Sequence, residues 1–356
     1  MSASTFTLYT FAMSHYSEKI RWTLDAARLS YREEVMTPVF HMLPALRMGG
    51  RGQTTLPVLE GQGTGTLSGI TVGGGFAAQR ERLGPGGQRM LLRGTYFYHF
   101  VLSLLEQRQG RWNASVQAAA QAEQASRKAL AMRLPQDDGL TRLNIASDVG
   151  NALARRTQAY RGAGRLADAE QVLREYIRFA AEEALPLKFR SGIYIVAANL
   201  RFGQREFAQS EQLARKSEQI LEELGEDALS PNRTSRRRDL FVALAGQKKW
   251  PQALQEVRRL DDLAKGNPAA VNRVRFGFDR AYVYLGNGLH VEAAALFERV
   301  AQSNRQTYGD GHFFVAQAQG LQGVALWRTG SPEHKARALS LLEQAAQDLV
   351  HPRNAD

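Results

Sequence analysis

Carboxylate pairs and histidines are the side chains of this sequence that could perform acid–base or metal chemistry. The acids form two adjacent pairs, Asp137-Asp138 and Asp261-Asp262, in turn-like contexts. Adjacent residues on a helix point about 100° apart, which suits solvation or capping better than paired catalysis. The histidines lack metal-ligand spacing, and the absence of cysteine excludes disulfides, cysteine nucleophiles and thiolate zinc sites. No nucleophile-elbow or zinc-helix motif occurs, so residues 90–356 indicate neither catalysis nor a metal site.

The first sixty residues predict a small sheet with one helix. Residues 5–11 are rich in β-branched and aromatic side chains, as is typical of a strand. Residues 17–28 form an amphipathic helical pattern, and residues 31–35 predict a second strand. A turn then leads into a third strand at 54–60, which a proline opens. This order predicts a thioredoxin-like βαβ unit.

Motifs within these elements resemble the N-terminal domain of glutathione S-transferases. The resemblance implies glutathione as the ligand, with the Ser14 hydroxyl at a helix start stabilising the thiolate as the catalytic group. It also implies backbone contacts to glutathione from Leu56, which precedes a cis Pro57, and a further contact from Ser68. Without the rest of the motif, Ser14 reads as a helix N-terminal residue and Pro57 as a strand-entry proline. The matching segments are Leu8-Tyr9, Ser14-His15-Tyr16-Ser17-Glu18-Lys19-Ile20-Arg21-Trp22, Leu29-Ser30-Tyr31 and Thr55-Leu56-Pro57-Val58-Leu59.

The remainder of that family's motif is altered. The family places an acidic residue beside a serine at the start of a third helix, and here Leu67 stands in the acidic position before Ser68. Residues 61–87 are rich in glycine, which disfavours a helix. We therefore expect an incomplete thioredoxin-like segment at 1–68 and a glycine-rich connector at 69–88. Catalysis is not expected, and a glutathione-dependent transferase or reductase is the alternative function.

A short motif recurs six times in the rest of the chain: a tight turn, a polar residue, a bulky residue, and then Ala or Ser opening an apolar helical run. Two of its copies are Gly110-Arg111-Trp112-Asn113-Ala114-Ser115 and Gly164-Arg165-Leu166-Ala167-Asp168-Ala169. Most copies are spaced by about forty residues, which is typical of stacked helix pairs. Each pair requires a small residue where its two helices cross closely. The residues predicted to pack at these crossings are Ser115, Ala169, Ser210, Ala253, Ala293 and Ala338.

These motifs resemble tetratricopeptide repeats (TPRs), in the longer variant found in kinesin light chains and bacterial signalling proteins. The segment Leu321-Gln322-Gly323-Val324-Ala325-Leu326-Trp327-Arg328 resembles helical arrays that precede effector domains such as CHAT domains. The predicted fold is mainly α. We expect a right-handed TPR-like α-solenoid of about six helix pairs over residues 89–350, preceded by the thioredoxin-like segment.

The net charge of +11 is unevenly distributed. Residues 1–75 have a balance of +1, so the surplus of +10 belongs to the helical part and favours an acidic peptide or protein partner. The arginines between 233 and 238 read as a solvated loop, and no nucleic-acid-binding motif accompanies them. No signal peptide or membrane-spanning run is apparent, which indicates a cytoplasmic protein. The leading functional prediction is a protein-interaction scaffold without a cofactor.

Overall fold

The computed structural model describes residues 6–10, 31–35, 58–61, 66–68, 84–135, 137–267, 271 and 274–350. The chain forms two compact units. One comprises Met1–Ser103 with Gln117–Ala152, and the other comprises Leu104–Val116 with Leu153–Asp356.

The described strands of the first unit form one mixed sheet of order β2-β1-β3-β4. Strand β1 (Phe6–Thr10) pairs in parallel with β2 (Tyr31–Val35). Strand β3 (Val58–Gly61) runs antiparallel to β1 on its other side, and β4 (Thr66–Ser68) runs antiparallel to β3. A parallel pair requires a crossover connection, which agrees with the predicted βαβ order. The third strand begins at Val58, directly after the proline.

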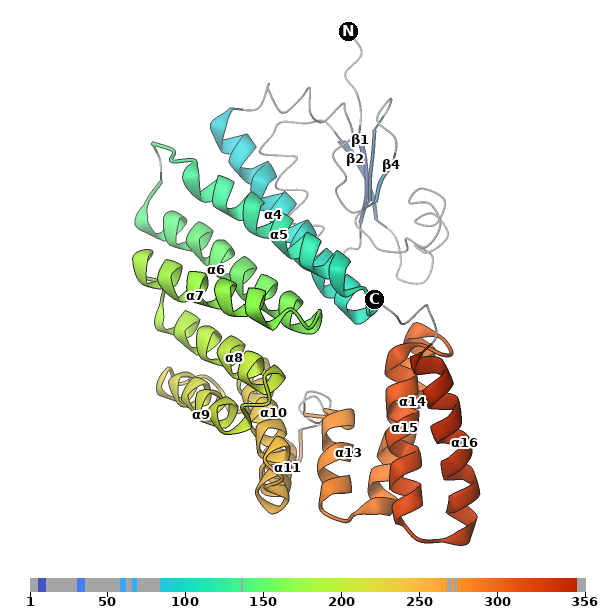
Figure 1. Cartoon of the computed structure of the whole chain (residues 1–356). Helices are drawn as coiled ribbons and strands as arrows, with labels where there is room; N and C mark the ends of the chain where they lie inside the picture. Colours follow the sequence, from blue (N-terminus) through green and yellow to red (C-terminus); the bar gives the residue numbers. More distant parts are fainter. Residues whose placement is uncertain are drawn as a thin grey trace. The chain divides into compact units, whose positions relative to one another are not determined.

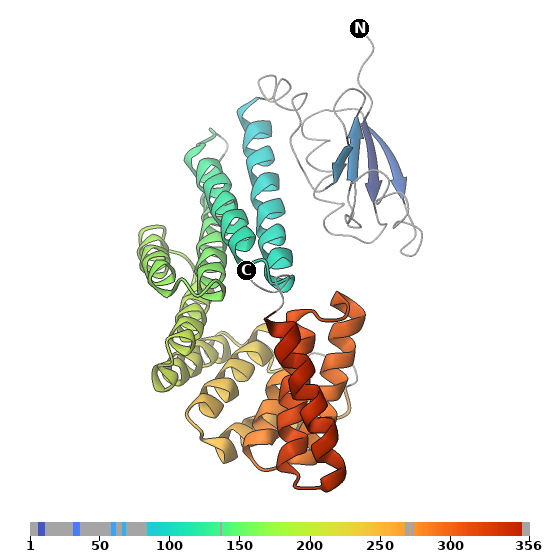
Figure 2. The same cartoon turned by 45° about the vertical axis from the view of Figure 1, so that its right-hand side comes forward.

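The rest of the described chain folds into successive antiparallel helix pairs, which confirms the mainly α, TPR-like prediction (Figures 1 and 2). We call the earlier helix of each pair the first helix and the later one the second helix. The first helix of the first pair begins at Pro85, inside the predicted connector. The pairs are α4 (Pro85–Arg108) with α5 (Trp112–Ala131), α6 (Gly139–Gly162) with α7 (Leu166–Glu182), α8 (Leu187–Gly203) with α9 (Phe207–Glu223), α10 (Pro231–Gly246) with α11 (Trp250–Ala264), α13 (Gly277–Gly286) with α14 (His290–Tyr308), and α15 (Phe313–Arg328) with α16 (Pro332–Leu349).

The small residue of every motif lies inside this stack. All six lie on second helices, close to their N-terminal ends, and each has an exposed fraction of 3% or less. Larger apolar residues one turn later complete the same buried face, as Leu173 does after Ala169 and Phe297 after Ala293. The helix pairs are therefore held together by cores that combine a small crossing residue with a larger neighbour.

The turn inside each pair requires one residue with left-handed backbone geometry. Glycine occupies this position in four turns, with φ between +72° and +78° at Gly110, Gly164, Gly288 and Gly330. The equivalent residues of the other two turns are Arg205 (φ +64°) and Lys248 (φ +60°). Because an L side chain is strained in this region, these two turns carry a cost that glycine would avoid.

We expect Lys248→Gly to raise the free energy of unfolding, by up to about 1 kcal/mol. Left-handed geometry costs a side-chain-bearing residue about 1–2 kcal/mol, and the greater freedom of glycine in the unfolded chain removes part of the gain. Lys248 is exposed, so the substitution removes little packing. Urea denaturation measures the change. Gly288→Ala is the reciprocal control and should lower stability by about 1 kcal/mol, and a less stable Lys248→Gly protein would contradict the expectation.

In four of the six copies, the bulky residue of the motif packs against a glycine of the following helix pair. Trp250 at the start of α11 lies over Gly286 at the end of α13, where an added Cβ would come within 2.2 Å of the indole. Phe207 lies in the same way over Gly246, with a corresponding separation of 2.5 Å. In these copies the bulky residue therefore joins successive pairs. The same arrangement places Trp112 over Gly162 and Leu166 over Gly203.

Candidate protein-binding surface

The residues that the glutathione S-transferase resemblance singles out lie almost entirely outside the described residues. Ser14, Leu56 and Pro57 are in this group. Ser68 is the last residue of β4, whose neighbour in the sheet is β3. The geometry of a glutathione site therefore stays a prediction, and the described residues that could recognise a ligand belong to the helices.

Charge is segregated between the two kinds of helix in the second unit. Its first helices α8, α10, α13 and α15 contain nine Lys/Arg against two Asp/Glu, a balance of +7. The second helices α7, α9, α11, α14 and α16 contain ten Lys/Arg against sixteen Asp/Glu, a balance of −6. Neighbouring first helices also contact each other, α8 with α10, α10 with α13 and α13 with α15. The positive charge is therefore concentrated on the first helices, chiefly on the adjoining α8 and α10.

The arginines of α10 are not in a solvated loop, so that interpretation of the sequence is wrong. Ser230 caps the helix by accepting a hydrogen bond from the Arg233 backbone N–H, and Pro231 occupies its first turn. Arg233 and Arg237 are one turn apart, and their side chains are only 8% and 6% exposed. Both donate to Glu218 Oε1 on α9, at 2.9 and 3.1 Å. The cluster is thus a partly buried structural element that connects α10 to the preceding helix.

Arg238 extends this network toward the next pair. It forms a bidentate pair with Asp279 on α13, at 2.7 and 3.3 Å, and contacts Asp239 Oδ1 at 3.2 Å. The other Asp239 oxygen accepts a hydrogen bond from Asn199 Nδ2 on α8 at 3.3 Å. Burial alone would lower the pKa of Arg238, but Asp279 and Asp239 more than offset it, and the pKa is raised. Burial raises the pKa of Asp239, against the opposing effect of Arg238 and Arg236.

Two guanidinium groups near this network have no hydrogen-bond or ion-pair partner among the described residues. They belong to Arg161 at the end of α6 and Arg236 on α10, and the Nε atom of each is buried. Burial lowers the pKa of both groups, and the Asp239 carboxylate partly opposes this effect in each case. The Glu226 and Glu218 carboxylates oppose the effect of burial on Arg236 as well.

Sequence analysis did not single out Arg161, Asn199, Asp239 or Asp279. One signal for two of them was present, because Asp239 and Asp279 are forty residues apart, the same separation as the repeat residues Ala253 and Ala293. Residues at equivalent repeat positions occupy equivalent places on successive first helices. Arg161 and Asn199 carry no comparable sequence signal.

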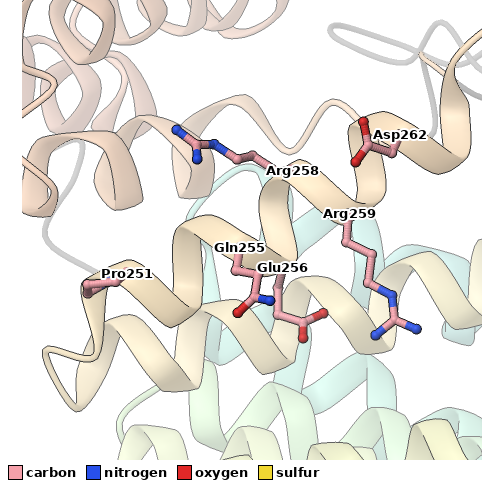
Figure 3. Close-up of a pocket in the computed structure, with 6 residues that line it drawn as sticks. All are labelled: Pro251, Gln255, Glu256, Arg258, Arg259 and Asp262. Carbon is pink, nitrogen blue, oxygen red and sulfur yellow. The ribbon is translucent and has the colours of Figure 1, made fainter.

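A surface depression of about 450 Å³ on α11 is a poor alternative site. Its lining side chains are drawn in Figure 3, and they all come from this single helix. Groups that perform catalysis or enclose a small ligand converge from several elements, which these do not. Within the described ranges, no cluster of three or more His, Asp or Glu could hold a metal ion, and no helix is long and apolar enough to cross a membrane. The lining residues are Pro251, Gln255, Glu256, Arg258, Arg259 and Asp262.

Comparison with known proteins confirms the resemblance of the first segment to the N-terminal domain of glutathione S-transferases. Residues 8–70 match the family model of the glutathione S-transferase N-terminal domain. Among solved structures, the chain is similar to BtubC (BKLC) from P. vanneervenii, with 15% identity, a TM-score of 0.47, and coverage of 67% of this chain and 90% of that one. No curated protein sequence matches.

Two other solved structures are similar over comparable lengths. The apo form of RapI shares 10% identity with a TM-score of 0.47, covering 77% of this chain and 91% of that one. A putative kinesin light chain from Podosopora anserina, which has TPR-like repeats, shares 16% identity with a TM-score of 0.31, covering 70% and 92%. No function follows from similarities of this size.

Proposed function

We propose that the helical repeats bind an acidic segment of a partner protein on the layer formed by the first helices. The observation that carries this proposal is the charge segregation in the second unit, +7 on the first helices against −6 on the second helices. A segment rich in Asp and Glu is attracted to the first layer and repelled by the second. Charge therefore selects both the partner and the face that it occupies.

Contacts between neighbouring first helices support an extended ligand. Because α8, α10, α13 and α15 adjoin in sequence order, side chains from successive pairs can contact successive residues of one peptide. The network of Arg238, Asp239 and Asp279 holds α10 and α13 in register, so the basic layer is preorganised. Preorganisation reduces the entropy lost on binding.

We expect a fluorescein-labelled peptide of alternating Glu and Ala to bind the full chain, and its Gln-Ala counterpart not to bind. Arg190 on α8 and Arg328 on α15 are exposed and belong to the basic layer. Reversing both charges, as Arg190→Glu with Arg328→Glu, should weaken binding about tenfold because it removes attraction and adds repulsion. Fluorescence anisotropy measures the affinity, which should fall as salt is raised.

The matched control reverses two exposed arginines of second helices, Arg178→Glu on α7 and Arg299→Glu on α14. This variant has the same net charge as the first one but leaves the basic layer unchanged. Equal losses in the two variants, or equal binding of the two peptides, would contradict the proposal. Preferential binding of duplex DNA over the glutamate peptide would contradict it too.

Glutathione-dependent chemistry is the second candidate function. It is favoured by the family match over residues 8–70 and by the sheet order β2-β1-β3-β4 in the same segment. Retention of the full chain on immobilised glutathione, lost in Ser14→Ala, would support it. The peptide assay tests the helical repeats and the glutathione assay tests the N-terminal segment, so the result of one assay does not decide the other.

A further inference from the structure

One face of the second helix α9 packs against the following helix pair. Phe207 lies over Gly246 at the end of α10, and Glu218 accepts hydrogen bonds from Arg233 and Arg237 of the same helix. Residues spaced by four, seven and four positions share one side of an α-helix, so these contacts form a single stacking face. Its four residues, each in contact with α10 or the turn that follows it, are Phe207, Glu211, Glu218 and Glu222.

The equivalent face of α16 is exposed, and we call it the open face. Leu339 and Val350 are 49% and 80% exposed, and they occupy the positions that Glu211 and Glu222 have in α9. Helix α16 packs against α15 through another side, where Ala345 is buried against Gly320. Counted from the small residue of each motif, the open face consists of four exposed residues, Lys335, Leu339, Ala346 and Val350.

Trp327 at the end of α15 enlarges the apolar surface beside the open face. Its side chain is 46% exposed, and the Lys335 ammonium lies 5.7 Å from the centroid of its ring. An ammonium group at this distance is attracted to an indole, and the aliphatic stem of the lysine can cover apolar surface. The open face and Trp327 thus form an exposed apolar surface of the kind that marks an interaction site.

The charges of this surface are arranged symmetrically about Leu339. Lys335 precedes Leu339 by four residues and Glu343 follows it by four, and both charged side chains are exposed. If two identical helices pair antiparallel about a two-fold axis at Leu339, each Lys335 faces the Glu343 of the other copy. A parallel pair in register would instead place like charges opposite each other, which is unfavourable. The surface is therefore complementary to itself in one orientation.

We infer that the open face is a dimerisation surface, on which α16 of a second copy of this chain packs antiparallel to α16 of the first. The self-complementarity of its charges favours a second copy over another protein, because both Lys–Glu pairs form at once and the two Leu339 side chains meet at the axis. This inference goes beyond the proposed function, which assigns peptide binding to the first helices.

The size of the surface sets the strength of the expected dimer. One helix face from each chain gives an interface at the low end of the usual size range, and exposed ion pairs contribute little to affinity. We therefore expect a reversible dimer that forms at about 10–100 µM. Sedimentation velocity of the full chain, over concentrations up to about 200 µM, should show monomer converting to dimer as the concentration rises.

Leu339→Glu should weaken the dimer at least about tenfold, because it removes an apolar contact and places two carboxylates side by side at the axis. Leu349→Glu is the matched control on the same helix. Leu349 is 43% exposed, similar to Leu339, but it lies about 80° around the helix from the open face. The control should change the dissociation constant by less than about twofold.

A charge exchange tests the antiparallel arrangement. Lys335→Glu and Glu343→Lys should each weaken the homodimer about fivefold, because like charges then face each other twice. An equimolar mixture of these two variants should form a heterodimer about as strong as the wild-type dimer, since every Glu then faces a Lys. Arg299→Glu reverses an exposed charge on α14 and should leave the dimer unchanged.

Three results would overturn the inference. The first is a chain that stays monomeric over the whole concentration series. The second is a dimer that Leu339→Glu does not weaken, because its contact would then lie elsewhere. The third is a dimer that Leu339→Glu disrupts but that the mixture of Lys335→Glu and Glu343→Lys does not restore, which excludes the antiparallel pairing. Thermal unfolding of dilute samples separates loss of the dimer from loss of the fold, and all variants should melt within about 3 °C of the wild type.

Discussion

Glu218→Gln should lower the free energy of unfolding by about 3–5 kcal/mol, one of the two largest effects we expect in the described chain. Glu218 Oε1 accepts hydrogen bonds from both Arg233 and Arg237, whose side chains are less than a tenth exposed. Glutamine keeps the size of the side chain but removes its charge, so two buried cations lose their shared counter-ion. Glu222 compensates Arg233 in part, from a mostly exposed position at 3.2 Å, and no ion pair remains for Arg237 among the described residues.

The control for this substitution lies on the same helix. Glu223 is exposed, and its hydrogen bond is to Gln219 of the same helix at 2.7 Å, so Glu223→Gln should change stability by no more than about 0.5 kcal/mol. Urea denaturation followed by far-UV circular dichroism measures both variants. Because repeat proteins can unfold in parts, the urea concentration at the midpoint is compared together with the dependence of the free energy of unfolding on urea concentration. Equal midpoints for the two variants would show that the buried ion pairs contribute little.

The burial of the α10 arginines could not be predicted from the local sequence. Four arginines close to a helix start oppose the helix dipole and favour solvent exposure when that segment is considered alone. Besides Asp239 on the same helix, their counter-charges are on other helices, Glu218 before the cluster and Asp279 well after it. The pairing could be recognised only from spacing, since Arg233 with Arg237 and Glu218 with Glu222 are both four residues apart and face each other across α9 and α10. Which helices adjoin is a tertiary fact that local propensity does not contain.

The repeat architecture was predictable because the residue types of each motif indicate which of its positions are packed between helices. Ala169 and Ala253 had to be small for two helices to cross, and both are fully buried. The left-handed geometry at Lys248 was less apparent, although glycine fills the same position of the motif at Gly164 and Gly288. The contact of the bulky residue with the following pair was not predicted, since it joins residues thirty-six positions apart in the case of Trp250 and Gly286.

The thioredoxin-like segment was predictable in order and partly in extent. The parallel pairing of β1 with β2 agrees with the predicted βαβ order, whereas the antiparallel pairing of β3 with β1 was not predicted. The glycine-rich stretch was expected to run to residue 88, whereas α4 begins at Pro85. Proline is favoured in the first turn of a helix, and that signal outweighed the helix-breaking tendency of Gly86 and Gly87. The predicted roles of Ser14, Leu56, Pro57 and Ser68 stay predictions.

The candidate surface became visible only when the helices were sorted by their place in each pair. The whole-chain charge of +11 indicated an acidic partner but not a location. Along the sequence, the basic helices α8 and α10 are each followed by an acidic helix, so a running charge average hides the segregation. Once α8 is known to contact α10 and α10 to contact α13, the basic residues combine into one layer. The sequence does not show that Arg161 and Arg236 lack hydrogen-bond partners among the described residues, because this depends on side-chain geometry.

Gly286→Ala should lower the free energy of unfolding by about 2 kcal/mol, although alanine is the better helix former. The gain in helix propensity is about 0.5–1 kcal/mol, whereas forcing a methyl group into a filled contact costs about 1–3 kcal/mol. An added Cβ would come within 2.2–2.5 Å of three atoms of the Trp250 indole. The ring cannot swing away freely, because it packs edge-on against Tyr282 and because Asn287 donates a hydrogen bond to the Trp250 carbonyl at 2.9 Å. Thermal and urea unfolding measure the loss.

Gly203→Ala is the matched control, because the equivalent bulky residue there is Leu166. The nearest contacts of an added Cβ are 3.3 Å to Arg161 and 3.4 Å to Leu166, both flexible side chains that can shift by a few tenths of an ångström. This variant should therefore remain within about 0.5 kcal/mol of the wild type. Introducing Trp250→Leu into the Gly286→Ala protein reproduces the Leu166 arrangement and should recover part of the loss, giving a favourable coupling energy in a double-mutant cycle. Additive effects in that cycle would mean that the indole does not bear the clash, and that successive helix pairs are joined by other contacts.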